Sequence, residues 1–167
     1  INAGISAANS KSELELIKYK IINFQPDLII IYDGWNDWSK FSATDTIQNW
    51  KSICELGNNN GFDTIITVQP LPSTGNRVLT EQEIVNIFKG VTYPAKAEQY
   101  VESFDNLKNY CFKTVDFRGI FDYVQEPVYW DDGHTMSNGN QIIAQNMFSI
   151  ISPIYFEKEY SIIENVN

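Results

Sequence analysis

The only histidine of the chain lies in a short polar stretch that could do acid–base chemistry. In "WDDGHTMSNGN", residues 130–140, Asp131 precedes His134 by three residues, just ahead of an apolar helical run. At this spacing in a turn, the carboxylate can reach the imidazole Nδ1–H, fix its tautomer and stabilise the imidazolium that forms after proton abstraction. The pair is typical of an oriented general base. A solvated surface turn is the alternative, and Asp132 is the rival partner.

Two other polar segments could bind a developing negative charge. The stretch "GWND", residues 34–37, follows an apolar run, so the Asn36 amide could be a fixed donor for an oxyanion. Asp37 could brace this loop through backbone N–H groups, and Trp35 could form a substrate wall. The stretch "NAGIS", residues 2–6, is a small-residue turn before a helix, where backbone N–H groups can bind an anionic oxygen. Taken alone, each segment also fits an ordinary turn.

Strands and helices alternate along the chain in the way that a parallel sheet requires. The apolar segment "DLIIIYDG" predicts a strand buried on both faces, "FDTIITVQPLP" repeats the strand pattern, and "KTVDFRGIF" predicts a third strand. The spacing of apolar residues and the capping pairs predict helices over residues ~11–24 (Ser12 with Glu15), ~44–57, a short one after Thr80 (with Glu83), ~94–111, and one from Ser137 that Pro153 ends. This alternation favours a three-layer α/β/α sheet.

Three polar motifs follow predicted strands. "GWND" comes directly after the first strand, "QPLPSTGN" after the second, and the Asp131 to His134 stretch lies downstream of the third. In open parallel sheets, ligands bind in the crevice at the carboxyl ends of the strands. The three motifs should therefore gather at one edge of the sheet.

Composition limits the classes of function. A chain of 167 residues with 43% hydrophobic residues predicts one globular domain. The net charge of −9 disfavours binding to nucleic acid or to an anionic membrane surface. The longest apolar run, residues 28–32, is far below the ~20 residues that a membrane span needs. Cys54 and Cys111 lack metal-ligand spacing and each lies on the apolar stripe of a predicted helix, which predicts buried free thiols.

The histidine stretch, "GWND" and "NAGIS" together resemble the SGNH (GDSL-like) hydrolases. "NAGIS", Gly34-x-Asn36-Asp37 and Asp131-x-x-His134 are similar, in order and placement, to the second, third and fifth sequence blocks of that family. The resemblance implies a flavodoxin-like parallel sheet and a serine carboxylic-ester hydrolase. It implies His134 as the general base, Asp131 as the acid that orients it, and Asn36 with the N–H near Ala7 as the oxyanion hole. Gly34, Asp37 and Trp35 would support the site or line it.

The same resemblance implies a small-molecule or glycan ester as substrate, acyl or acetyl, and neither a metal nor an organic cofactor. The chain departs from the family at two points. No Gly-Asp-Ser, the block that carries the family's nucleophile, occurs in it, and Ala7 stands where the family has the glycine of the oxyanion hole.

The missing nucleophile block predicts an N-terminally truncated domain. In the family's strand order, the absent first strand lies between the next two strands, so "LIIIY" would be left as an open edge. We therefore expect residues 1–167 to form a single domain that lacks its first strand and nucleophile turn, and to be inactive as a fragment.

Two other classes of function fit parts of the sequence. A non-catalytic domain of the same fold could bind a carbohydrate or an acyl group through aromatic side chains, namely Trp35, Trp38, Tyr129 and Trp130. A flavodoxin-like receiver or nucleotide-binding domain fits the strand and helix pattern, but the chain has no glycine-rich phosphate loop. The sequence predicts neither the compartment nor the oligomeric state.

Overall fold

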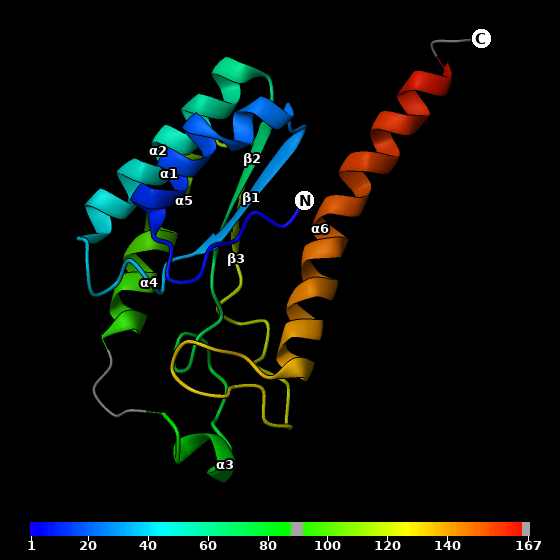
Figure 1. Ribbon diagram of the computed structural model, residues 1–167. Helices are drawn as coiled ribbons and strands as arrows, with labels where there is room; N and C mark the ends of the chain where they lie inside the picture. Colours follow the sequence, from blue (N-terminus) through cyan, green and yellow to red (C-terminus); the bar gives the residue numbers. More distant parts are fainter. Residues whose placement is uncertain (88–91, 165–167) are drawn as a thin grey trace.

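The protein is a parallel sheet between helical layers. The computed structural model describes residues 1–87 and 92–164, with side chains as far as Ile154. Three parallel strands, β1 (Leu28–Asp33), β2 (Asp63–Val68) and β3 (Lys113–Asp116), lie in the order β1-β2-β3. Figure 1 shows α1, α2 and α4 on one side of this sheet and α6 on the other. The predicted α/β/α architecture is confirmed.

The central and outer strands differ in burial. In β2 every residue after Asp63 is buried, as expected for a strand with a partner on each side and helices over the sheet. β1 pairs with β2 in register from Leu28 opposite Asp63, and no strand of the described residues pairs with its outer edge. The "LIIIY" strand is thus an open edge, as expected for a missing first strand. The prediction that it is buried on both faces is wrong, because most of its residues are only half-buried.

The first two helices begin and end at other residues than predicted. α1 (Ser10–Tyr19) is capped by a reciprocal pair of Asn9 and Ser12, so the Ser12–Glu15 capping box is wrong, and a separate 3-10 turn, η1 (Ile21–Phe24), follows. The Asn9 side chain accepts the N–H of Ser12, which starts the helix earlier. α2 (Ala43–Asn60) runs on to Gly61, whose left-handed backbone ends it.

The later helices also differ from the sequence pattern. α3 (Glu81–Ile84) starts at the predicted Thr80 cap, which is confirmed. The single helix predicted over ~94–111 is wrong: α4 (Tyr93–Glu102) and α5 (Phe104–Leu107) meet at Ser103, whose hydroxyl donates to the Tyr100 carbonyl. α6 (Ser137–Glu164) begins as predicted but continues past Pro153. A proline removes one backbone N–H donor from the helix, and the helix continues without it.

Helices on one face of the sheet enclose the main core. α2 and α4 contribute Trp50 and Tyr100, whose rings meet edge to face with centroids 4.8 Å apart, and both side chains are fully buried. A second, smaller cluster lies under the start of α6 and consists of Phe121, Val128 and Tyr129, with Ile142 and Ile143 packed against them. This smaller cluster supports the segment that carries the histidine.

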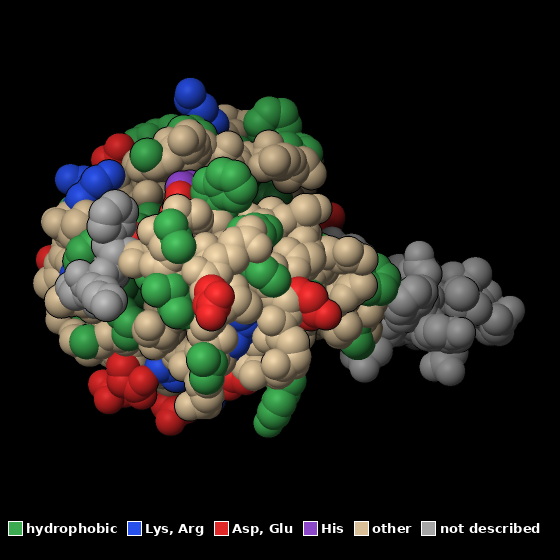
Figure 2. All heavy atoms as spheres, turned by 90° about the horizontal axis from the view of Figure 1, so that it is seen from below, with side chains coloured by type: hydrophobic (Ala, Val, Ile, Leu, Met, Phe, Trp, Pro, Cys, Tyr) green, Lys and Arg blue, Asp and Glu red, His purple; other side chains and the backbone are tan. Residues whose placement is uncertain are grey.

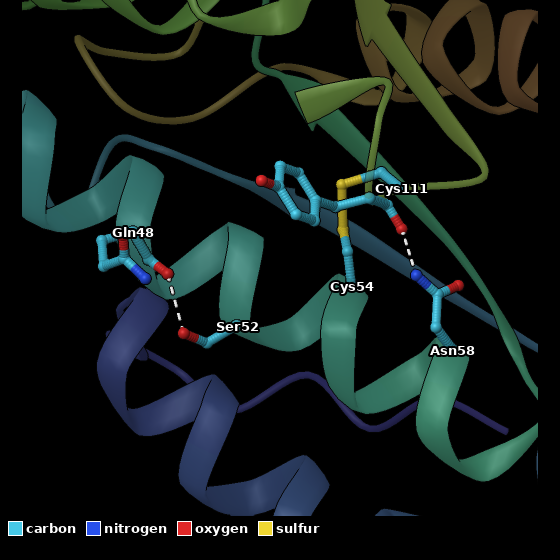
Figure 3. The surroundings of a disulfide bond; sticks show 6 residues. Gln48, Ser52, Cys54, Asn58 and Cys111 are labelled. Carbon is cyan, nitrogen blue, oxygen red and sulfur yellow. Dashed lines mark hydrogen bonds between the residues drawn. A yellow bond between two sulfur atoms is a disulfide. The ribbon is translucent and has the colours of Figure 1, made fainter. Parts of the chain in front are cut away.

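The two cysteines form a disulfide between Cys54 of α2 and Cys111, which follows α5 (Figure 3). The prediction of free thiols is therefore wrong. The two residues are 57 positions apart, but the fold brings their Cα atoms to 4.8 Å, within the range that a disulfide requires. Next to the bond, the Asn58 amide donates to the carbonyl of Tyr110 at 2.7 Å. Cys54 lies on the buried face of α2 as predicted, whereas Cys111 is buried in the turn after α5 and not on a helix.

Candidate active site

His134 and Asp131 form a side-chain pair at the tip of a tight hairpin. The imidazole Nδ1 lies 2.9 Å from Asp131 Oδ1 and 3.1 Å from its Oδ2. The hairpin is closed by the bridge between Tyr129 and Thr135 and by the Trp130 N–H, which donates to the His134 carbonyl at 2.8 Å. With Nδ1–H donating to the carboxylate, Nε2 carries the free lone pair and can accept a proton.

Asp131 is held as an anion by its own turn. Its Oδ1 accepts the N–H of Gly133 at 2.8 Å and that of His134 at 2.9 Å. Burial opposes ionisation of this carboxyl, but the Gly133 N–H, the imidazole and the His134 N–H outweigh burial and lower the pKa of Asp131 below its usual range. The carboxylate can therefore orient the ring and stabilise its cationic form.

The loop after β1 meets this hairpin through Trp35. The indole lies so close to Gly133 that any Cβ there would overlap the Trp35 Nε1. Three further contacts fix the tryptophan. Its backbone N–H donates to Gln69 Oε1 at 3.0 Å, and its indole ring packs on the rings of Trp38 and Tyr93. Trp35 thus joins the loops that follow β1 and β2 to the histidine hairpin. Asn36, the next residue, is half-buried.

Gly34 begins the same loop with a backbone that requires glycine. Its φ is 125°, and a Cβ would come within 3.0 Å of the Tyr93 hydroxyl. Asp37, at the end of the loop, is fully buried and accepts the N–H of Ser10 at 2.9 Å, the Ser10 hydroxyl, and the Thr46 hydroxyl at 3.0 Å. Asp37 therefore fastens this loop to the N-terminus of α1.

Ala7 lies just ahead of α1 in an exposed turn. Its φ is 58°, in the left-handed region that glycine adopts at little cost. Alanine at this position therefore takes up a backbone geometry that favours glycine, and keeps its N–H. The attachment of Ser10 to Asp37 holds this turn on the side of the molecule where the "GWND" loop lies.

Three carboxyl groups lie together beneath the loop, and sequence reasoning missed two of them. Asp33, at the end of β1, is 3% exposed, and its Oδ2 has no hydrogen-bond partner among the described residues. Burial, followed by the charges of Glu13 and Asp37, raises the pKa of Asp33 to about 9. Burial and the charge of Asp37 raise the pKa of Glu13 to about 7. The cluster therefore retains protons that the unfolded chain would release.

We expect Asp33→Asn to stabilise the protein at alkaline pH. The folded state holds the Asp33 proton up to about pH 9, whereas an unfolded aspartate loses its proton near pH 4, so the stability of the wild type falls as the pH rises between these values. Asparagine does not titrate. Its gain in unfolding free energy should be larger at pH 8 than at pH 5 by up to about 4 kcal/mol, or about 1.4 kcal/mol for each pH unit, since the dependence that Glu13 contributes is common to both proteins.

Urea unfolding of both proteins at the two pH values measures this difference. Asp105→Asn is the matched control because that carboxylate is 92% exposed, and its effect should be small at either pH. An Asp33→Asn curve parallel to that of the wild type would contradict the proton-retaining cluster.

The histidine reaches the surface at the face where the strands end. Seen from below the view of Figure 1, the purple imidazole is visible among acidic and hydrophobic atoms (Figure 2), and its side chain is 76% exposed. Trp130 beside it is also exposed, whereas Tyr129 is 2% exposed and belongs to the core. Tyr129 is therefore not part of a binding surface.

Within residues 1–87 and 92–164, no group of three His, Cys, Asp or Glu side chains could hold a metal ion. No helix in the described part of the chain is long and apolar enough to cross a membrane. Besides Asp33 and Glu13, sequence reasoning assigned no contact to Gln69, Glu83 and Gly133, which act through distant segments. Glu83 gave a signal as the third residue of a helix-capping pair, and Gln69 as the first residue of the "QPLPSTGN" motif.

Comparison with solved structures shows which known proteins share this architecture. The chain superposes on a GDSL-like lipase from Bacteroides thetaiotaomicron with a TM-score of 0.68 and 20% identity, over 92% of this chain and 76% of the lipase. It superposes on the acetyl xylan esterase AlAXEase with a TM-score of 0.69 and 14% identity, over 89% of this chain and 79% of the esterase. This chain has the SGNH hydrolase fold.

A third solved structure of this fold, a point variant of an acetyl-xylooligosaccharide esterase from Geobacillus, has a TM-score of 0.67 at 14% identity, over 89% of this chain and 70% of that one. No family model and no curated protein matches the sequence. The likeness to the SGNH hydrolases is thus one of fold, found at low sequence identity.

Proposed function

We propose that this domain is the major part of a serine carboxylic-ester hydrolase. The observation that carries the proposal is the His134–Asp131 pair, in which Nδ1 meets the carboxylate and Nε2 is left as a base. A domain that only binds its ligand needs no oriented base. The SGNH hydrolase fold adds support, because the solved structures named above are a lipase and esterases.

Each residue has a defined role in the proposed reaction. His134 Nε2 removes the proton of a serine hydroxyl as its oxygen attacks the ester carbonyl carbon, and Asp131 stabilises the imidazolium that results. The Asn36 amide and the N–H near Ala7 bind the oxyanion. The imidazolium then protonates the departing alcohol. Water, deprotonated by His134, releases the acid from the acyl-serine.

The serine in this proposal belongs to a segment outside the 167 residues. The open edge of β1 supports this part, because its unpaired backbone groups and half-buried apolar side chains could accept one more strand. A strand beside β1 would end near Gly34, at the level of the "GWND" loop. A serine turn following that strand would lie at the edge of the sheet where Trp35 meets the histidine hairpin.

We propose acyl or acetyl esters of small molecules or glycans as substrates. Two of the structurally similar proteins are esterases for acetylated xylan or its oligosaccharides. Exposed Trp130 beside His134 gives the site an aromatic surface on which a sugar ring or an acyl chain could pack.

The test is to express the protein together with the coding sequence that precedes Ile1 and to assay short-chain p-nitrophenyl esters. We expect an upstream Gly-Asp-Ser, hydrolysis by the extended protein, and its loss in His134→Ala and in the serine variant. The 167-residue chain alone should be inactive. An in-frame start without that serine, together with no hydrolysis, would instead favour a binding domain on the same fold.

A further inference from the structure

Glu83 is a buried carboxylate that contacts the histidine hairpin from another part of the chain. Its side chain is 0% exposed and lies beside the smaller hydrophobic cluster. Its Oε1 accepts the N–H groups of Val128 at 2.8 Å and Tyr129 at 3.0 Å, which are 45 and 46 residues away. Its Oε2 accepts the N–H and hydroxyl of Thr80 and the guanidinium of Arg77.

The two N–H groups that Glu83 accepts belong to the base of the hairpin. The Val128 carbonyl accepts the N–H of Met136 at 2.7 Å, and Tyr129 forms the bridge to Thr135. His134 comes immediately before these partners. The position of Val128 and Tyr129 therefore sets the position of the turn at the hairpin tip.

Arg77 completes this anchor. Its guanidinium lies 2.9 Å from Glu83 and also donates to the carbonyls of Val124 and Glu126, and it packs over the ring of Tyr129. Burial opposes the charge of Glu83, but the Thr80, Val128 and Tyr129 N–H groups, with Arg77, outweigh burial and lower its pKa to about 2. The Glu83 carboxylate therefore stays ionised throughout the pH range in which esterases are assayed.

Capping α3 does not account for this arrangement. A glutamate at the third position of a helix usually caps it from an exposed site, and α3 has only four residues. In Glu83, by contrast, Oε1 accepts the two N–H groups of the hairpin, and only Oε2 takes part in the cap. A buried charge satisfied in this way fixes the position of its partners, because any displacement leaves a charge without donors.

We propose that Glu83 is a positioning residue for the general base: together with Arg77 it holds the 128–136 hairpin so that His134 and Asp131 keep their alignment. The role in catalysis rests on the proposed function, whereas the alignment itself does not. The loop after β2 thus acts on the site through the hairpin, although its anchor residues are not catalytic.

Imidazole ¹⁵N NMR of the 167-residue chain tests the alignment directly, because the single histidine gives one assignable pair of ring nitrogens. In the wild type we expect the neutral ring to carry its proton on Nδ1. In Glu83→Gln we expect a mixture of both tautomers, because the hairpin loses its fixed anchor. Asp122→Asn is the matched control: Asp122 joins the same two loops through Asn76, and its loss should leave the ring signals unchanged.

Kinetics of the extended protein provides the second readout. Glu83→Gln should lower kcat about 100-fold with little change in KM, because misplacement of the base affects the chemical step. If the wild type does not hydrolyse esters, the proposed function fails, and the NMR result alone decides the role of Glu83.

Wild-type ring signals in a folded Glu83→Gln protein would overturn the proposal. If Glu83→Gln does not fold, Arg77→Lys provides the same test. This variant keeps the positive charge but loses the forked donors to Val124 and Glu126, so a tautomer mixture is again expected. Unchanged ring signals in a folded Arg77→Lys protein would also overturn the proposal.

Discussion

Replacing Asp131 by asparagine should lower kcat for ester hydrolysis by about four orders of magnitude in the extended protein, with KM little changed. The carboxylate accepts the Nδ1 proton of His134. An asparagine amide can instead donate to Nδ1, so the ring would carry its proton on Nε2 and could no longer accept one from serine. The charge that stabilises the imidazolium is lost as well. Steady-state kinetics with a p-nitrophenyl ester measures the effect.

Asp132→Asn is the control for this prediction, since Asp132 is the neighbouring carboxylate and the rival partner in the sequence. The imidazole lies against both oxygens of Asp131, so Asp132→Asn should keep most of the activity. The reverse result, collapse in Asp132→Asn and activity in Asp131→Asn, would exchange the roles of the two residues. Imidazole ¹⁵N shifts of the same variants show whether the tautomer changes with the rate.

Removing the disulfide should cost about 4 kcal/mol of unfolding free energy. The bond closes a loop of 57 residues between Cys54 and Cys111, and in the chain-entropy description this constraint on the unfolded state gives a value of that size. The double variant Cys54→Ala with Cys111→Ala retains small apolar side chains at both buried positions. Denaturant unfolding of this variant and of the oxidised wild type measures the loss.

Reduction of the wild type is the internal control. A reductant should shift the wild-type unfolding curve toward that of the double alanine variant and leave the variant itself unchanged. Two titratable thiols in the unreduced, unfolded wild type would show that the bond is absent and would contradict the prediction.

Features that depend on neighbouring residues were predictable from the sequence. Asp131 and His134 are three residues apart in a polar stretch that reads as a turn, so their pairing could be expected from spacing alone. The strands β1 and β2 follow from runs rich in β-branched residues, and the Thr80 cap of α3 from a pattern of four residues. The helix ends were less predictable, because single side-chain contacts such as that of Asn9 decide between adjacent caps.

The contacts that complete the candidate site were decided by the tertiary structure. The disulfide, the attachment of Glu83 to Tyr129, and the packing of Trp35 on Gly133 each join segments far apart in the sequence. The same holds for the raised pKa of Asp33, which depends on burial and on charges from other elements. Residue type and spacing determine local hydrogen bonds and periodic faces, but which faces meet, and how much water they exclude, depends on how the whole chain packs.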